Sequence, residues 1–252
     1  MQKGFMNEKN FAKMIDKNKI KNLNVNIQSL IYAIFEDIEE DDVVECWTSK
    51  YFEKADIKIK INNEIKGVSI KTGKYCSMHQ ESTDSLYPFF RRIGIDERII
   101  NKLDNFLIGE VDGKRLDAIT YIFHNYDEIK MIKETLNNYY IKVNLILRFL
   151  FQGTEKQKYG CDAIIYGVPN KFTWATKEEI LEYLVNYDNN HEVYLKFSAL
   201  NLKSYDRNLR NNEMRKTKQN EIQIKWCTIN ADLENIKKLR VSNKNKKISN
   251  NY

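Results

Sequence analysis

Asp56, Ser69 and Lys71 place a carboxylate, a hydroxyl and an ammonium group in two neighbouring segments of the sequence. A carboxylate can hold a divalent cation, and a lysine can orient a water molecule or stabilise developing negative charge. These residue types could therefore form a catalytic site if the chain brings them together. The ordinary alternative is an Asp–Lys pair on the exposed face of a hairpin, which needs no function to explain it.

The elements that must position these side chains are two strands of a predicted β-hairpin. Residues 57–61 alternate isoleucine with lysine, and residues 64–71 resume the alternation after Asn62-Asn63. A period of two indicates half-buried strands, and asparagine tolerates the positive φ of a tight turn. With a two-residue loop, Asp56 stands opposite Ser69, at a Cβ separation of about 5 Å. The lysine two residues further along shares that face.

The segment of residues 36–84 resembles the PD-(D/E)xK nuclease superfamily, which includes many type II restriction endonucleases. That family carries an Asp near one strand of a hairpin and acid-x-Lys on the next, so Asp56 matches the first acid and Lys71 the lysine. This sequence departs from the pattern twice: Ala55 replaces a proline, and Ser69 replaces the middle acid. Some restriction enzymes resemble this variant and take the missing carboxylate from the following helix.

The resemblance implies Mg²⁺-dependent hydrolysis of phosphodiester bonds. Asp56 and Glu81 would hold the metal, and the backbone carbonyl of Ile70 would complete its shell. Lys71 would orient or activate the attacking water, and Ser69 would support the site. Other possible sources of the second carboxylate are Asp84 and, from a helix before the hairpin, Glu36 or Glu39. For the last two, we favour an acidic solvated face over a role at the metal.

The rest of the chain predicts an α/β fold, with a mixed β-sheet flanked by helices as in restriction endonucleases. Apolar spacing predicts helices over residues 26–41, 79–93, 95–107 and 126–152, the last ending at Gly153, and a capping box begins another at Thr176. Strands are predicted over residues 43–47, 161–166, 192–198 and 221–226. The prediction is a single domain with a catalytic core at about 26–230 and polar, basic ends: residues 1–24, disordered or a short helix, and a frayed tail, 237–252.

Composition limits the function classes. The 252 residues carry a net charge of +6, which is compatible with nucleic acid but can also reflect a genome rich in lysine and asparagine codons. The four cysteines are scattered without a C-x-x-C pair, which favours a reducing cytoplasm and argues against a disulfide framework or structural zinc.

No apolar run approaches the roughly 20 residues of a membrane span. Residues 67–74 lack the spacing of a phosphate-binding P-loop.

Arginine, lysine and asparagine side chains supply the predicted DNA contacts, because they bind phosphates and base edges. These residues are Arg91, Arg92, Arg207, Asn208, Arg210, Arg215 and Lys218. For the five residues from Arg207 to Lys218, the alternative to DNA contact is an exposed basic loop without a function. Together with these residues, the resemblance implies a sequence-specific endonuclease that cuts double-stranded DNA as a homodimer. The alternatives are a non-catalytic nucleic-acid-binding protein of the same fold and a structure-specific repair or recombination nuclease.

Overall fold

The computed structural model describes residues 2–49, 53–74, 76–155, 160–187, 194–204 and 220–249. The chain divides into two compact units. Unit 1 comprises Met1–Cys76, Phe151–Tyr183 and Thr228–Tyr252, and unit 2 comprises Ser77–Leu150 and Leu184–Cys227. Among the described residues, no helix combines the length and the apolar character needed to cross a membrane.

Unit 1 is built on a six-stranded sheet of order β1-β2-β3-β4-β8-β9. Its strands are β1 (Asn18–Lys19), β2 (Val43–Thr48), β3 (Ile57–Ile61), β4 (Glu64–Lys71), β8 (Ala163–Val168) and β9 (Lys171–Thr176). Neighbouring strands are antiparallel except β4 and β8, which are parallel. The sheet is therefore mixed, and most of unit 2 is inserted between its two parallel strands in the chain.

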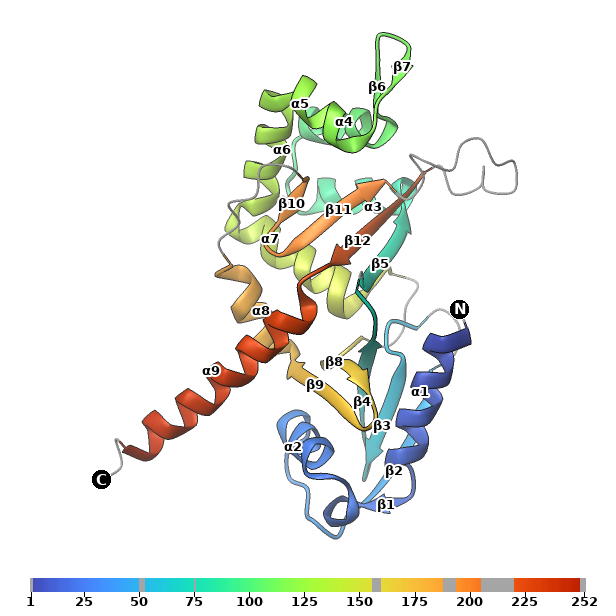
Figure 1. Ribbon diagram of the computed structural model, residues 1–252, viewed down its shortest axis with the longest axis vertical. Coiled ribbons are helices and arrows are strands. Elements are labelled where there is room, and N and C mark those ends of the chain that lie inside the picture. The colour runs from blue at the N-terminus through green and yellow to red at the C-terminus, as the bar shows by residue number, and fades with distance from the viewer. Residues whose placement is uncertain are drawn as a thin grey trace. The chain divides into compact units, whose positions relative to one another are not determined.

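The helices of unit 1 are α1 (Gln2–Ile15), α2 (Val25–Ile34), α8 (Lys177–Val185) and α9 (Ile229–Ser249). Helix α1 packs on β2, and α2 and α9 pack on β9 (Figure 1). Of the two possibilities for residues 1–24, the short helix is confirmed, and its Phe11 and Ile15 are fully buried in the core. The helix predicted over residues 26–41 is too long. It ends at Ile34 because Phe35 is extended and Asp37 adopts a left-handed φ of 50°.

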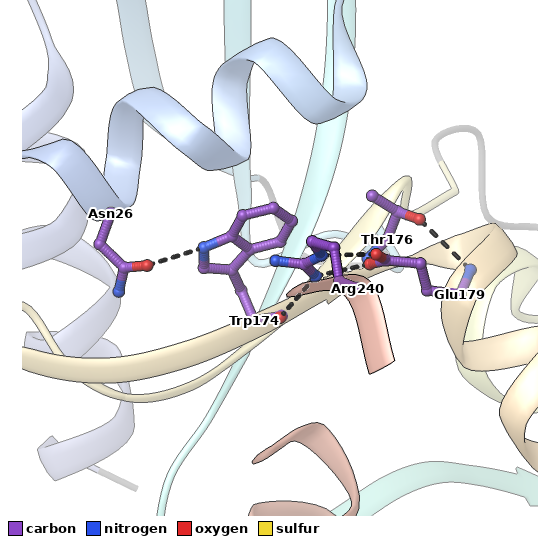
Figure 2. Close-up of polar contacts among 5 residues, drawn as sticks. All are labelled: Asn26, Trp174, Thr176, Glu179 and Arg240. Atoms are coloured by element: carbon purple, nitrogen blue, oxygen red, sulfur yellow. Dashed lines mark hydrogen bonds and ion pairs between the residues drawn. The ribbon is translucent and has the colours of Figure 1, made fainter. Parts of the chain in front are cut away.

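Helix α9 is attached to the sheet through Arg240, as Figure 2 shows. The guanidinium lies 3.7 Å from the Trp174 ring and donates to both carboxylate oxygens of Glu179, at 2.5 and 2.6 Å. Trp174 in turn donates from Nε1 to Asn26 of α2 at 2.9 Å. Glu179 also accepts from the backbone N–H of Thr176, which confirms the predicted capping box. The prediction of a frayed tail from residue 237 is wrong around Arg240, where these contacts hold α9, and the backbone is helical to Ser249.

Unit 2 is built on a four-stranded sheet of order β10-β11-β12-β5. Its strands are β5 (Cys76–Ser82), β10 (Lys196–Phe197), β11 (Leu200–Ser204) and β12 (Glu221–Trp226). Its helices are α3 (Thr83–Arg92), α4 (Glu97–Ile108), α5 (Ala118–His124), α6 (Tyr126–Asn137) and α7 (Tyr139–Ile146), which continues as a π-helical segment, Leu147–Gln152. A small hairpin joins β6 (Glu110–Val111) to β7 (Lys114–Arg115).

Two predicted helices of unit 2 are corrected. Residues 79–82 belong to strand β5 instead of a helix, because this stretch joins the sheet next to β12 and α3 begins only at Thr83. The helix predicted over residues 126–152 is interrupted at Asn138, whose side chain accepts hydrogen bonds from the N–H groups of Tyr140 and Ile141 and so starts α7 afresh. Gly153 has the positive φ, 73°, expected of a helix end.

Candidate active site

The β3–β4 hairpin has the register that the sequence predicts. Ile61 pairs with Glu64 and Ile57 with Val68, across a turn in which Asn62 has a φ of 54°. Beyond the last of these pairs, the N–H of Asp56 donates to the carbonyl of Val68 at 3.0 Å. Asp56 therefore lies beside Ser69, on the strand end away from the turn.

The Asp56 carboxylate receives three hydrogen bonds, all on Oδ2. The donors are Ser69 Oγ at 2.8 Å, the backbone N–H of Ile70 at 2.6 Å and Lys71 Nζ at 3.0 Å. Among the interactions of the described residues, Oδ1 accepts no hydrogen bond. The Asp56 and Lys71 side chains stay partly exposed, at 22% and 19%. The hairpin thus fixes the carboxylate through one oxygen and leaves the other available.

Lys71 is protonated at neutral pH in this arrangement. Desolvation by itself would lower the pKa of its ammonium group, but the charge and the hydrogen bond of Asp56 outweigh this and raise the pKa above its usual value. The neighbouring thiol of Cys161 is buried, and desolvation raises its pKa to about 12. Cys161 therefore stays a neutral thiol, and the cluster contains no reactive thiolate.

Glu8 of α1 joins this electrostatic cluster, although the sequence analysis did not single it out. Burial raises the pKa of its carboxyl, the charge of Asp56 raises it further, and Lys71 opposes the shift. A signal was present in the sequence. Glu8 stands three, four and seven residues before Phe11, Ala12 and Ile15, which are the buried apolar positions described in α1. An acid on the apolar stripe of a helix faces inward.

Backbone contacts hold the base of the hairpin against β8. The N–H of Gly67 donates to Asp162 Oδ2 at 2.8 Å, and the N–H of Asp162 donates to the Gly67 carbonyl at 2.7 Å. A Cβ on Gly67 would lie 2.1 Å from the carbonyl oxygen of Gly160, so only glycine fits there. Asp162 thus has a structural role, because it joins the hairpin to the start of β8.

The cluster suits Mg²⁺ better than a transition metal. No group of three or more His, Cys, Asp or Glu side chains in the described part of the chain could hold a metal ion. Mg²⁺ does not require such a group, because it commonly binds one or two carboxylates and fills the remaining positions with water and substrate phosphate. The open oxygen of Asp56 and the carboxylate of Glu8 match that requirement.

Glu81, the predicted second metal ligand, lies in unit 2 within a buried ion pair. Arg148 donates from Nε to Oε1 at 3.1 Å and from Nη2 to Oε2 at 2.7 Å, and His79 Nε2 lies 3.1 Å from Oε1. The Glu81 side chain is only 2% exposed. Both of its oxygens are therefore engaged inside unit 2.

The other predicted acids lie elsewhere. Asp84 is exposed in the first turn of α3, in unit 2. In unit 1, the backbone N–H of Glu39 donates to Asp42, and the side chain of Asp42 accepts from Asn62 at the hairpin turn. Glu36 is exposed and acts on the pKa of Lys66, beside that turn. The turn and Asp56 are at opposite ends of β3, so Glu36 and Glu39 are not part of the cluster.

Of the predicted DNA contacts, the structure describes two. Arg91 forms a bidentate, exposed ion pair with Glu97 at 2.7 and 2.8 Å, and Arg92 lies over the Phe89 ring at 5.5 Å. The others, Arg207, Asn208, Arg210, Arg215 and Lys218, lie outside the described residues.

Comparisons with known proteins support the fold. No protein-family model and no curated protein matches the sequence. Among solved structures, the chain is similar to the crystal structure of restriction endonuclease MspI in complex with its cognate DNA, with a TM-score of 0.59 over 88% of each chain and 13% sequence identity. The chain therefore has a restriction-endonuclease-like α/β fold, a mixed sheet flanked by helices, as the sequence predicts.

Proposed function

We propose that this chain is a Mg²⁺-dependent endonuclease that cleaves double-stranded DNA at a specific sequence, like a type II restriction enzyme. The observation that carries the proposal is the Asp56 carboxylate, held on Oδ2 by three donors with Oδ1 left available. The restriction-endonuclease-like fold supports it, because the similar solved structure contains a restriction endonuclease with its cognate DNA.

Asp56 and Glu8 would hold the magnesium ion, together with the backbone carbonyl of Ile70. Bound there, Mg²⁺ would supply Lewis acidity toward the scissile phosphate and lower the pKa of a bound water. We favour Glu8 over Glu81 as the second carboxylate, since Glu8 shares the electrostatic environment of Asp56 and Lys71. Glu81 would first have to give up its ion pair with Arg148.

The side chains of the hairpin have separate tasks. Lys71, kept protonated by Asp56, serves as a fixed cation that orients the attacking water and stabilises negative charge developing on the phosphate. Ser69 donates to Asp56 and holds its carboxylate in one orientation. The described part of the chain contains one such cluster, and we therefore propose that a homodimer cuts both strands at one site.

A cleavage assay tests the proposal. Purified protein is incubated with plasmid and with phage-length DNA, in Mg²⁺ or in EDTA. Discrete fragments that require Mg²⁺ are expected, and the sequences of their ends define the site. A metal-dependent smear would indicate a structure-specific or nonspecific nuclease instead.

A non-catalytic DNA-binding protein is the second candidate. The observation that favours it is that Lys71 already neutralises Asp56 without a metal, at 3.0 Å, while Ser69 stands where the family has an acid. Retained gel shifts with no cleavage over a range of Mg²⁺ and Mn²⁺ concentrations would select this candidate.

A further inference from the structure

Unit 2 contains a groove, apart from the Asp56 cluster, with a volume of about 460 Å³. Strand β11 contributes Asn201 and Lys203 to it, and β12 contributes Gln223 and Lys225. Ile119 of α5 adds an apolar surface. The groove thus offers amide and ammonium groups beside apolar atoms, which suits a partner with flat apolar faces and hydrogen-bonding edges.

The register of the sheet fixes this arrangement. Asn201 is paired with Lys225, and Lys203 with Gln223, so each amide faces a lysine across the two strands. The residues between them on both strands point into the core of unit 2 and are buried. A slip of one residue would turn all four polar side chains into that core, so the pattern is strongly specified.

The groove is also positively charged. Lys203 and Lys196 lie 5.8 and 5.7 Å from the ring of Tyr194, and no ion pair within the described part of the chain neutralises either lysine. Two carboxylates in the described part of this region accept hydrogen bonds: Asp117 from the N–H groups that begin α5, and Glu221 from Gln80. Among the described residues that line the groove, Lys203 and Lys225 outnumber the one carboxylate, Asp117, so an anionic partner would meet a net positive surface.

Asn201 points to a ligand independently of charge. Its side chain lines the groove, yet the residue is only 5% exposed. Within the described residues its amide has no hydrogen-bond partner. The amide therefore offers its donor and its acceptor to the groove, and a bound group that both accepts and donates could pair with them.

Duplex DNA fits these features. Amides pair with adenine edges and lysines with guanine edges in the major groove, which admits paired β-strands. Residues on one face of a strand are about 6.6 Å apart, close to the rise of about 6.8 Å over two base-pair steps. We propose that this groove contacts base edges of the DNA and that Asn201, Lys203, Gln223 and Lys225 determine sequence specificity. The inference rests on the proposed function, since it assigns the specificity of the same enzyme.

The test selects bound duplexes from a random-sequence library in EDTA, using full-length protein with Gln223→Ala or Lys225→Ala. Both positions are half-buried, so these variants avoid the folding risk of changing Asn201. Each is expected to lose its base preference at one position of the selected site and to bind the parent's site about 10-fold or more weakly. The matched control is Lys130→Ala, an exposed lysine of α6, which should keep the parent's preference.

Several outcomes separate the two proposals. Unchanged preference in both variants overturns the inference, and so does uniform weakening on all sequences, which indicates phosphate contacts alone. If the parent still cuts discretely in that case, the nuclease proposal stands. If preference shifts as expected while the parent never cuts, the inference stands and the nuclease proposal fails.

Discussion

Two carboxylates that the sequence analysis assigned to one metal site, Asp56 and Glu81, have opposite surroundings in their own units. Asp56 is 22% exposed and uses one oxygen for all its hydrogen bonds. Glu81 is 2% exposed and has both oxygens engaged by Arg148 and His79. The comparison teaches that the function of an acid depends on whether an oxygen remains available, which residue type and spacing do not reveal.

Replacing Asp56 tests the first half of this comparison and should have the largest effect. Asp56→Ala is expected to slow DNA cleavage by more than about 1,000-fold, the upper range for removing one electrostatic group. The thermal midpoint should fall modestly, because Lys71 loses its counterion but is still 19% exposed. Plasmid cleavage rates measure the loss of activity, and a melting curve measures the change in thermal midpoint. The control is Asp41→Ala, which removes an exposed acid paired with Lys19 and Lys21 and should cut normally.

Replacing Glu81 tests the second half. Glu81→Gln leaves the Arg148 charge buried without a counterion, so the free energy of unfolding should fall by about 3 kcal/mol. Chemical denaturation measures this loss. The control is Glu97→Gln, which breaks an equally bidentate but exposed pair with Arg91 and should cost far less stability. Cleavage per folded molecule should match the parent, and a large loss of cleavage that excess Mg²⁺ partly restores would make Glu81 the metal ligand.

The Glu81 ion pair also predicts an acid-sensitive stability. Burial alone would raise the pKa of Glu81, but hydrogen bonds and charges from His79 and Arg148 lower it from 4.5 to about 2. A carboxyl group whose pKa is lower in the folded state stabilises the fold at any pH above its pKa in the unfolded chain. This stabilisation is lost as the pH falls toward the pKa of the folded state. Stability of the parent should therefore decline between about pH 4.5 and pH 2, and Glu81→Gln should lack this part of the decline.

Glu8 sharpens the comparison, because it has the opposite pKa shift. Burial and the charge of Asp56 raise its pKa, so the folded state binds its proton more tightly than the unfolded chain does. The protonated Glu8 carboxyl therefore contributes its full stabilisation when the pH is below the ordinary pKa of a glutamate. This stabilisation is lost as the pH rises through the raised pKa of the folded state. Without metal, Glu8→Gln should therefore be slightly more stable than the parent at neutral pH.

In cleavage, Glu8→Gln should behave as a variant with a damaged metal site. We expect activity at limiting Mg²⁺ to fall about 100-fold, with partial recovery at high Mg²⁺. The parent should need more Mg²⁺ as pH falls through the raised pKa of Glu8, and the variant should lack this dependence. Magnesium titrations at several pH values measure it, with Glu39→Gln as the control. Parent-like behaviour of Glu8→Gln would leave Asp56 without its proposed partner.

The hairpin could be predicted from sequence because its determinants are local. Alternating isoleucines, a two-residue Asn-Asn turn and the count outward to Asp56 fix the register without knowledge of the rest of the chain. The capping box at Thr176 is local in the same sense. Such signals decide which side chains face one another across a hairpin, so the cluster of Asp56, Ser69 and Lys71 followed from them.

What the sequence did not reveal depends on partners distant in the chain. Glu8 enters the cluster because α1 packs on β2, a contact between segments some thirty residues apart (Figure 1). Residues 79–82 have helical spacing, but pairing within the unit 2 sheet makes them a strand. The end of the chain is polar, yet Arg240 stacks on Trp174 and holds α9. Local patterns carry no information about such pairings.

Replacing Ser69 should have the smallest effect, and it tests whether the hydroxyl only positions the Asp56 carboxylate. Its hydroxyl is one of three donors on Oδ2, and the Ile70 N–H and Lys71 remain when it is removed. Ser69→Ala should therefore only loosen the carboxylate and reduce cleavage by about 10-fold, as for other groups that orient a metal ligand. Initial rates at saturating Mg²⁺ measure this. A loss as large as that of Asp56→Ala would show that the serine acts in the reaction itself, because positioning alone cannot account for it while two donors still hold the same oxygen.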